Sequence, residues 1–106
     1  MSLSVATFKS VWIKGGTTQL VFALIVKRSD SGSYVSETDG KLTCTATIAG
    51  KKIPVGTSGF LTTQQIPVGT CVWRLAKKYK GKTVRGTVTV TVGDRTISRS
   101  AVGKVP

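Results

Sequence analysis

Apolar and polar residues alternate along several short segments of the chain, and this alternation predicts β-strands. The clearest examples are residues 42–48 and 71–75, in which every second residue is apolar. A period of two places successive side chains on opposite faces of a strand. Glycine and proline separate the segments, which we expect at 5–13, 19–27, 42–49, 51–55, 59–62, 70–76, 83–92 and 95–102.

Seven or eight short strands in about 100 residues are typical of an antiparallel β-sandwich. The most specific turn is near the end of the chain, where Gly93-Asp94 separates Val92 from Arg95. Glycine at the first position of a two-residue turn favours a tight hairpin. This hairpin would pair Val90 with Ile97 on one face and hydroxyl residues on the other: Thr89 with Ser98, and Thr87 with Ser100. We interpret these hydroxyls as ordinary solvent-facing strand residues.

Residues 20–26 are apolar without interruption. On a strand, the even-numbered side chains face one way, while Val21, Ala23 and Ile25 face the other. Only one face of a sandwich strand meets the core, so the second face needs other cover. We expect the loop 28–41 to supply it, with a neighbouring domain or a second copy of the chain as alternatives. The last alternative makes Val21, Ala23 and Ile25 candidates for self-association.

Charge changes this picture from a generic sandwich to a strongly basic one. Sixteen Lys and Arg residues against four Asp and Glu residues give a net charge of +12. Such a charge attracts polyanions, including nucleic acid, anionic wall polymers, sulfated glycans and acidic membrane surfaces. The densest basic stretch surrounds a tyrosine, and two arginines follow it, so the candidate polyanion-binding residues are Lys77, Lys78, Tyr79, Lys80, Lys82, Arg85, Arg95 and Arg99.

The stretch 77–85 allows two interpretations. Its lysines could contact phosphates while a base stacks on Tyr79, which is how many proteins bind single-stranded nucleic acid. The stretch also lies where one strand ends and crosses to the next, so solvated lysines on a connecting loop are the more ordinary explanation. If the sheets bring residues 74–104 together, they form a basic face.

Residue types for catalysis or metal binding are scarce. The sequence has no His, and three of its four acids, Asp30, Glu37 and Asp39, fall within 28–41. No serine has a recognisable base, and two distant cysteines without His do not make a zinc site. The acid spacing matches no calcium-loop motif. We therefore expect no catalytic site, no metal and no cofactor.

Cys44 and Cys71 each lie on the apolar side of an alternating segment. They are compatible with one disulfide between two strands, which would close a loop of about 27 residues and stabilise the fold by roughly 3.5 kcal/mol. A disulfide indicates an oxidising compartment. The first residues carry no basic or long apolar region, so we expect any secretion signal to be missing from this chain. The longest apolar run, residues 20–26, is far shorter than the ~20 residues of a membrane-spanning helix, so no transmembrane segment is expected.

Three stretches resemble a known family: residues 43–52 (TCTATIAGKK), 69–75 (GTCVWRL) and 80–90 (KGKTVRGTVTV). They are similar to the immunoglobulin-like modules near the C-termini of secreted bacterial proteins, which share a Cys-led turn, a Cys-x-Trp strand and a Lys-Gly-Lys-x-x-Arg-Gly loop. The resemblance implies an extracellular sandwich with a Cys44–Cys71 disulfide, Trp73 beside it in the core, and an accessory or adhesion-type role. Antibody domains place a Trp between their two cysteines, whereas Trp73 follows the second.

We therefore predict one domain over residues 1–106, an all-β, immunoglobulin-like antiparallel sandwich of about seven strands with one inter-strand disulfide. The expected function is that of a non-catalytic extracellular or cell-surface module that binds anionic wall polymers or glycans. A nucleic-acid-binding domain using residues 77–85 is the first alternative. A structural subunit that self-assembles into a homo-oligomer through the strand 20–26 is the second.

Overall fold

The computed structural model describes residues 2–106, which form eight β-strands and one short 3₁₀ turn. The strands are β1 (Leu3–Ile13), β2 (Thr18–Arg28), β3 (Lys41–Ile48), β4 (Lys51–Ile53), β5 (Thr57–Thr63), β6 (Ile66–Leu75), β7 (Thr83–Val92) and β8 (Arg95–Lys104). The 3₁₀ turn η1 (Lys77–Tyr79) lies between β6 and β7. Within residues 2–106, no helix is long and apolar enough to cross a membrane.

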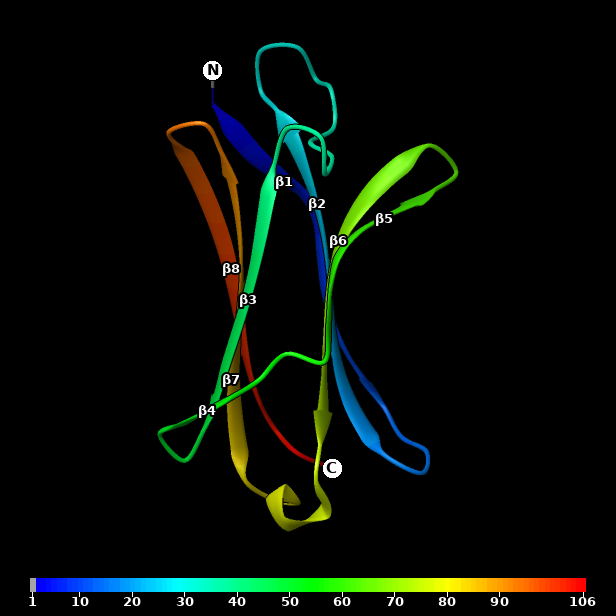
Figure 1. Ribbon diagram of the computed structural model, residues 1–106, viewed down its shortest axis with the longest axis vertical. Coiled ribbons are helices and arrows are strands. Elements are labelled where there is room, and N and C mark those ends of the chain that lie inside the picture. Colours follow the sequence, from blue (N-terminus) through cyan, green and yellow to red (C-terminus); the bar gives the residue numbers. More distant parts are fainter. Residues whose placement is uncertain (1) are drawn as a thin grey trace.

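The strands form two antiparallel sheets that face each other (Figure 1). Sheet A has the strand order β1-β2-β6-β5, and sheet B has the order β4-β3-β7-β8. These orders correspond to the ABED and CFG sheets of an immunoglobulin-like domain, with β4 added at the edge of the second sheet. The expected sandwich is therefore confirmed with eight strands, and each expected segment corresponds to one of them.

The core lies between the sheets, and burial alternates along the strands that form it. Every second residue of β2, β6 and β7 is buried. Phe22 of β2 meets Trp73 of β6 edge-to-face, with ring centroids 5.0 Å apart. Both rings are fully buried, so the expected place of Trp73 in the core is confirmed. Aromatic rings of this size supply much of the buried area of a small core.

A disulfide joins Cys44 of β3 to Cys71 of β6, with the two Cα atoms 5.9 Å apart. The expected pairing is confirmed, and it links an inner strand of one sheet to an inner strand of the other. Antibody domains place their bridge between strands B and F, which correspond to β2 and β7 here. At that position Gly86 of β7 instead faces the ring of Phe22.

The hairpin of β7 and β8 has the register expected from its turn. Val92 pairs with Arg95 around Gly93-Asp94, and the pairing continues residue by residue to Thr83 and Lys104. The hydroxyls of Thr87 and Ser100 are 2.8 Å apart. Together with β3, this hairpin gives sheet B a hydroxyl-rich outer face, made of Thr43, Thr45, Thr47, Thr87, Thr89, Thr91, Thr96, Ser98 and Ser100.

The loop between β2 and β3 packs on the end of β2 and not over its middle. Val35 is buried in the core and its N–H donates to the Val26 carbonyl at 2.9 Å, while Tyr34 pairs with Lys27. Figure 1 shows the loop at one end of the sandwich. Val21, Ala23 and Ile25 are therefore left half-buried on the outer face of sheet A, without the cover expected from this loop.

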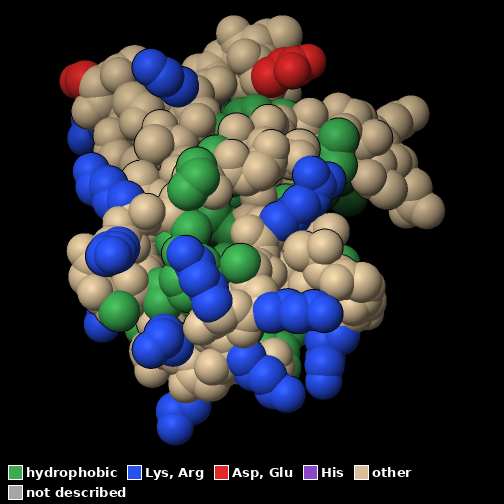
Figure 2. All heavy atoms as spheres, turned by 60° about the horizontal axis from the view of Figure 1, so that its bottom comes forward, with side chains coloured by type: hydrophobic (Ala, Val, Ile, Leu, Met, Phe, Trp, Pro, Cys, Tyr) green, Lys and Arg blue, Asp and Glu red, His purple; other side chains and the backbone are tan. Residues whose placement is uncertain are grey.

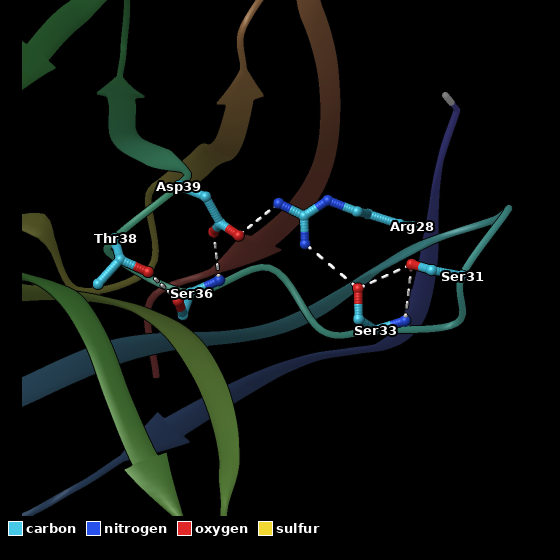
Figure 3. A network of polar contacts seen from close by, with 6 residues as sticks. All are labelled: Arg28, Ser31, Ser33, Ser36, Thr38 and Asp39. Carbon is cyan, nitrogen blue, oxygen red and sulfur yellow. Dashed lines mark hydrogen bonds and ion pairs between the residues drawn. The ribbon is translucent and has the colours of Figure 1, made fainter.

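The same loop is closed by an ion pair between Arg28 and Asp39 (Figure 3). The other oxygen of Asp39 accepts a hydrogen bond from the Ser36 N–H at 2.9 Å. The Arg28 guanidinium bonded to Asp39 holds the pKa of that carboxyl below its ordinary value of 3.8. Across residues 2–106, the His, Cys, Asp and Glu side chains form no group of three or more that could hold a metal ion.

Candidate functional site

Lysines from four parts of the chain gather at one end of the sandwich, which we call the basic end. In antiparallel sheets alternate connections lie at the same end, and here these are the β1–β2 turn, the β3–β4 turn, the crossover from β6 to β7, and the end of β8 (Figure 1). Figure 2 shows the resulting concentration of basic side chains. The lysines of this end are Lys14, Lys51, Lys52, Lys77, Lys78, Lys80, Lys82 and Lys104.

The acids lie at the opposite end. Asp30, Glu37 and Asp39 are in the β2–β3 loop, and Asp94 is in the β7–β8 turn. Two of them face arginines of that same end: Asp39 pairs with Arg28, and Asp94 lies 3.8 Å from Arg95. The two ends therefore differ in charge, because carboxylates offset the basic side chains at one end and not at the other.

The backbone of the basic crossover, residues 76–82, is fixed by hydrogen bonds. The N–H groups of Tyr79, Lys80 and Lys82 donate to carbonyls three residues earlier, at 2.9–3.1 Å. Gly81 has a φ of 80°, and its N–H donates to the Val105 carbonyl at 2.8 Å. Glycine adopts this left-handed conformation without the steric cost of a side chain. The lysine side chains are thus exposed on a well-defined backbone.

A hollow of about 280 Å³ opens between the β1–β2 turn, the crossover and the end of the chain. Its lining includes three lysines, Lys14, Lys77 and Lys80, beside the apolar groups of Val105 and Pro106. The lysines come from two connections far apart in sequence. The fold therefore places three lysine residues around one concave surface.

Tyr79 has little free ring surface in this crossover. It is half-buried and packs against the hydrophobic core. The ammonium nitrogen of Lys78 lies 5.2 Å from the centroid of its ring, in a cation–π contact. One face of the ring is thus taken by the preceding residue of the chain.

The eight residues expected to bind polyanions do not share one surface. Those from Lys77 to Lys82 belong to the basic end, and Arg85 follows on the outer face of sheet B, in the row that contains Thr47 and Lys52. Arg95 lies at the acidic end beside Asp94. Arg99 lies in the middle of β8 and donates to the Ser98 carbonyl at 2.8 Å. Residues 74–104 therefore do not form a single basic face.

Sequence reasoning missed three of the eight lysines of the basic end, Lys14, Lys51 and Lys52, whereas Lys104 fell within the basic face considered for residues 74–104. Lys14 precedes Gly15-Gly16, and Lys51-Lys52 follow Ala49-Gly50, so both groups sit at turns. Counting connections along an antiparallel chain would have put these turns and the crossover at the same end. The signal was therefore in the turn positions and not in local charge density.

No protein-family model matches the chain, and no curated protein matches it. Among solved structures, it is similar to the crystal structure of a DUF4426 family protein from Pseudomonas aeruginosa PAO1. The TM-score is 0.69, and the match covers 98% of this chain and 90% of that one. The sequence identity is 15%, so the similarity supports the fold alone.

Proposed function

We propose that this chain is a non-catalytic extracellular interaction module that binds anionic wall polymers or glycans through its basic end. The separation of charge carries the proposal: exposed lysines gather at one end, and the acids lie at the other. A charge distribution of this kind directs a polyanion to one part of the surface and speeds its association.

The residue types at the basic end suit a repeating polymer. Lysine presents a compact charge on a flexible stem, whereas arginine presents a rigid fork that selects a particular geometry. The end is dominated by lysines on a fixed backbone, so it can follow anionic groups whose spacing varies. The hollow bounded by Lys14, Lys77 and Lys80 is a place for one anionic group of the polymer.

The extracellular part of the proposal is supported by the disulfide, since such bonds persist in oxidising compartments. We also propose that the chain is one of the immunoglobulin-like modules of secreted bacterial proteins. The bridge, the buried Trp73 and the glycine-dependent Lys-Gly-Lys turn agree with what that resemblance implies. An adhesion-type role follows from the same resemblance.

The non-catalytic part of the proposal is supported by the available chemistry. The sequence has no His, and both cysteines are held in the disulfide. The carboxylates lie at the end opposite the lysines, away from the concave surface of the basic end. The usual pairing of a nucleophile with a positioned base would therefore need residues that the chain does not bring together.

Nucleic acid is the competing ligand for the same lysines. Binding of single strands usually depends on aromatic rings that are free to stack on bases. Tyr79 is half-buried and in contact with Lys78, which favours a polymer that needs charge and no stacking surface.

The test is a comparison of two triple variants with the same loss of charge. Lys14→Ser, Lys77→Ser and Lys80→Ser remove the lysines of the hollow, while Lys41→Ser, Arg95→Ser and Arg99→Ser remove three charges elsewhere. Binding to heparin, to poly(glycerol phosphate) and to single-stranded DNA is measured by titration across a salt series. The first variant should lose about tenfold or more in affinity for the two anionic polymers, and the second about twofold or less.

Equal losses in the two variants would show that binding depends on net charge alone, and the proposed site would be wrong. A preference for single-stranded DNA that disappears on Tyr79→Ala would instead support the nucleic-acid alternative. Absence of binding to either anionic polymer at low salt would overturn the proposal as a whole.

A further inference from the structure

Apolar side chains extend across the outer face of sheet A. The strand register places Val11 of β1 beside Val21 of β2, and Val21 beside Val72 of β6. Further along the strands, Val68 of β6 lies beside Leu61 of β5. The apolar residues that matter here are Val11, Val21, Ile25, Val68, Val72 and Leu61, and they come from all four strands.

This face is more apolar than strand propensity requires. Leu61 is 62% exposed and Val11 is 48% exposed, although both are large and hydrophobic. The outer face of sheet B has the same kind of exposed strand positions, and threonine and serine fill most of them. Single exposed apolar residues are normal, whereas a contiguous apolar face indicates an interaction surface.

Charged side chains lie around this face and not in its middle. Lys9 is on the edge strand β1, while Lys27 and Arg74 are close to the ends of β2 and β6. Glu37 belongs to the β2–β3 loop and borders the hollow on the edge strand β5. Interfaces are depleted of charge at their centre and polar at their rim. The distribution on sheet A follows that arrangement.

Strand β5 carries both a projection and a hollow on this face. Leu61 projects as the most exposed of the large hydrophobic side chains described. Two residues earlier, Gly59 has open space where a side chain would be. A hollow of about 320 Å³ opens here, and it is lined by Thr57, Ser58, Gly59, Phe60, Leu61, Thr70, Val72 and, from the β2–β3 loop, Glu37. The two features are about 7 Å apart along the strand.

We infer that two copies of this chain dock through the outer faces of their sheets A, related by a twofold axis. The axis runs across the strands at the level of Phe60, so that Leu61 of each copy enters the hollow beside Gly59 of the other. In a twofold interface, when residue i of one copy contacts residue j of the other, residue j of the first copy also contacts residue i of the second. The projection and the hollow lie two residues apart on one strand, which meets that requirement.

Charge favours the same arrangement. A twofold axis across the strands reverses the second copy, so each basic end lies beside the partner copy's acidic end. An axis along the strands would place the two basic ends together and separate Leu61 from the hollow. With a net charge of +12 per chain, the first orientation minimises repulsion between copies.

The size of the outer face of sheet A determines how strongly the two copies are expected to associate. Four strands about 4.8 Å apart and about seven residues long present roughly 450 Å² per copy. Burying this area on both copies approaches the lower limit of about 1,000 Å² for a specific interface. The dimer should therefore be weak and depend on concentration.

The experiment measures mass by sedimentation velocity over a wide concentration range. Wild type should rise from the chain mass of 11.2 kDa toward twice that value. Leu61→Asp should stay monomeric, because it buries a carboxylate in the contact. The matched control is Val102→Asp, at a residue that is 55% exposed on the outer face of sheet B, and it should dimerise as wild type does.

Salt adds a second readout. Sodium chloride screens repulsion between the two basic chains, so the dimer fraction of wild type should rise with salt. Monomer alone at all concentrations would overturn the inference, and so would equal loss of dimer in the two Asp variants. A dimer that dissociates as salt is added would also overturn it, because the contact would then be electrostatic. Leu61→Asp should leave polymer binding unchanged, which keeps this test separate from that of the basic end.

Discussion

At the scale of single residues, Gly86 of β7 lies against two aromatic rings of the opposite sheet. A Cβ added there would lie 2.7 Å from Cζ of Phe22 and 3.5 Å from Cη2 of Trp73. Both rings are fully buried and have little room to move. We expect Gly86→Ala to lower the free energy of unfolding by about 1–3 kcal/mol, measured by urea denaturation.

Gly16→Ala is the matched control for this substitution. No atom lies within 4 Å of a Cβ built at Gly16, in the exposed β1–β2 turn. Its effect should stay within about 0.5 kcal/mol. Equal effects at the two glycines would mean that the ring of Phe22 gives way more easily than its packing indicates.

The ion pair of Asp39 makes stability depend on pH in the acid range. Because Arg28 lowers the pKa of Asp39 below 3.8, the pair stabilises the fold above about pH 4 and stops doing so as the pH falls through the folded-state pKa. The difference in unfolding free energy between wild type and Asp39→Asn should therefore be largest near neutral pH and shrink on acidification. Asp30→Asn is the control, because Asp30 lies in the same loop but outside this ion pair. A constant difference for Asp39→Asn would contradict the assignment.

Residue roles could be predicted where they depend on neighbours in sequence. Alternation was enough to place Trp73 and Cys71 on the buried side of one strand. The reason for a glycine at position 86 was not accessible, because Phe22 is distant in sequence and meets it only across the sandwich. The packing of Tyr79 against the core was not accessible for the same reason.

At the scale of strands, the disulfide is the strongest link between β3 and β6. Reduction should lower the free energy of unfolding by about 3.5 kcal/mol, because the bridge closes a loop of about 27 residues in the unfolded chain. Urea denaturation with and without a reductant measures this difference. Thiol titration of the unfolded, unreduced protein should find no reactive thiol. Two reactive thiols would contradict both the bridge and the extracellular proposal.

The strands themselves were predictable, and their neighbours were not. Each expected segment became a strand, and the period of two indicated this most directly in residues 42–48 and 71–75. The register of β7 and β8 was also predictable, since a two-residue turn fixes it. The pairing of β2 with β6 joins segments separated by three other strands, and no local pattern indicates it. The two outer faces of the sandwich follow from such pairings and could be seen only in the structure.

At the scale of the whole molecule, the basic end comes from topology. The lysines of the β1–β2 turn, the β3–β4 turn and the crossover are separated by long stretches of sequence, and only the antiparallel order brings them together (Figure 2). Net charge predicted an attraction to polyanions, but it could not place the site. Arg95 and Arg99 entered the sequence-based set because they are close in number to the lysine stretch, and the hairpin carries them away from it.

The bridge between β3 and β6 also has a mechanical consequence. β1 begins near one end of the long axis of the molecule, and the C-terminus lies toward the other (Figure 1). A chain pulled from two such points extends by about 3.4 Å for every residue that unfolds. The residues between Cys44 and Cys71 stay outside the stretched path, which shortens the fully extended chain by roughly 90 Å. Cys44–Cys71 therefore limits how far this module can lengthen under load, and a reductant removes that limit.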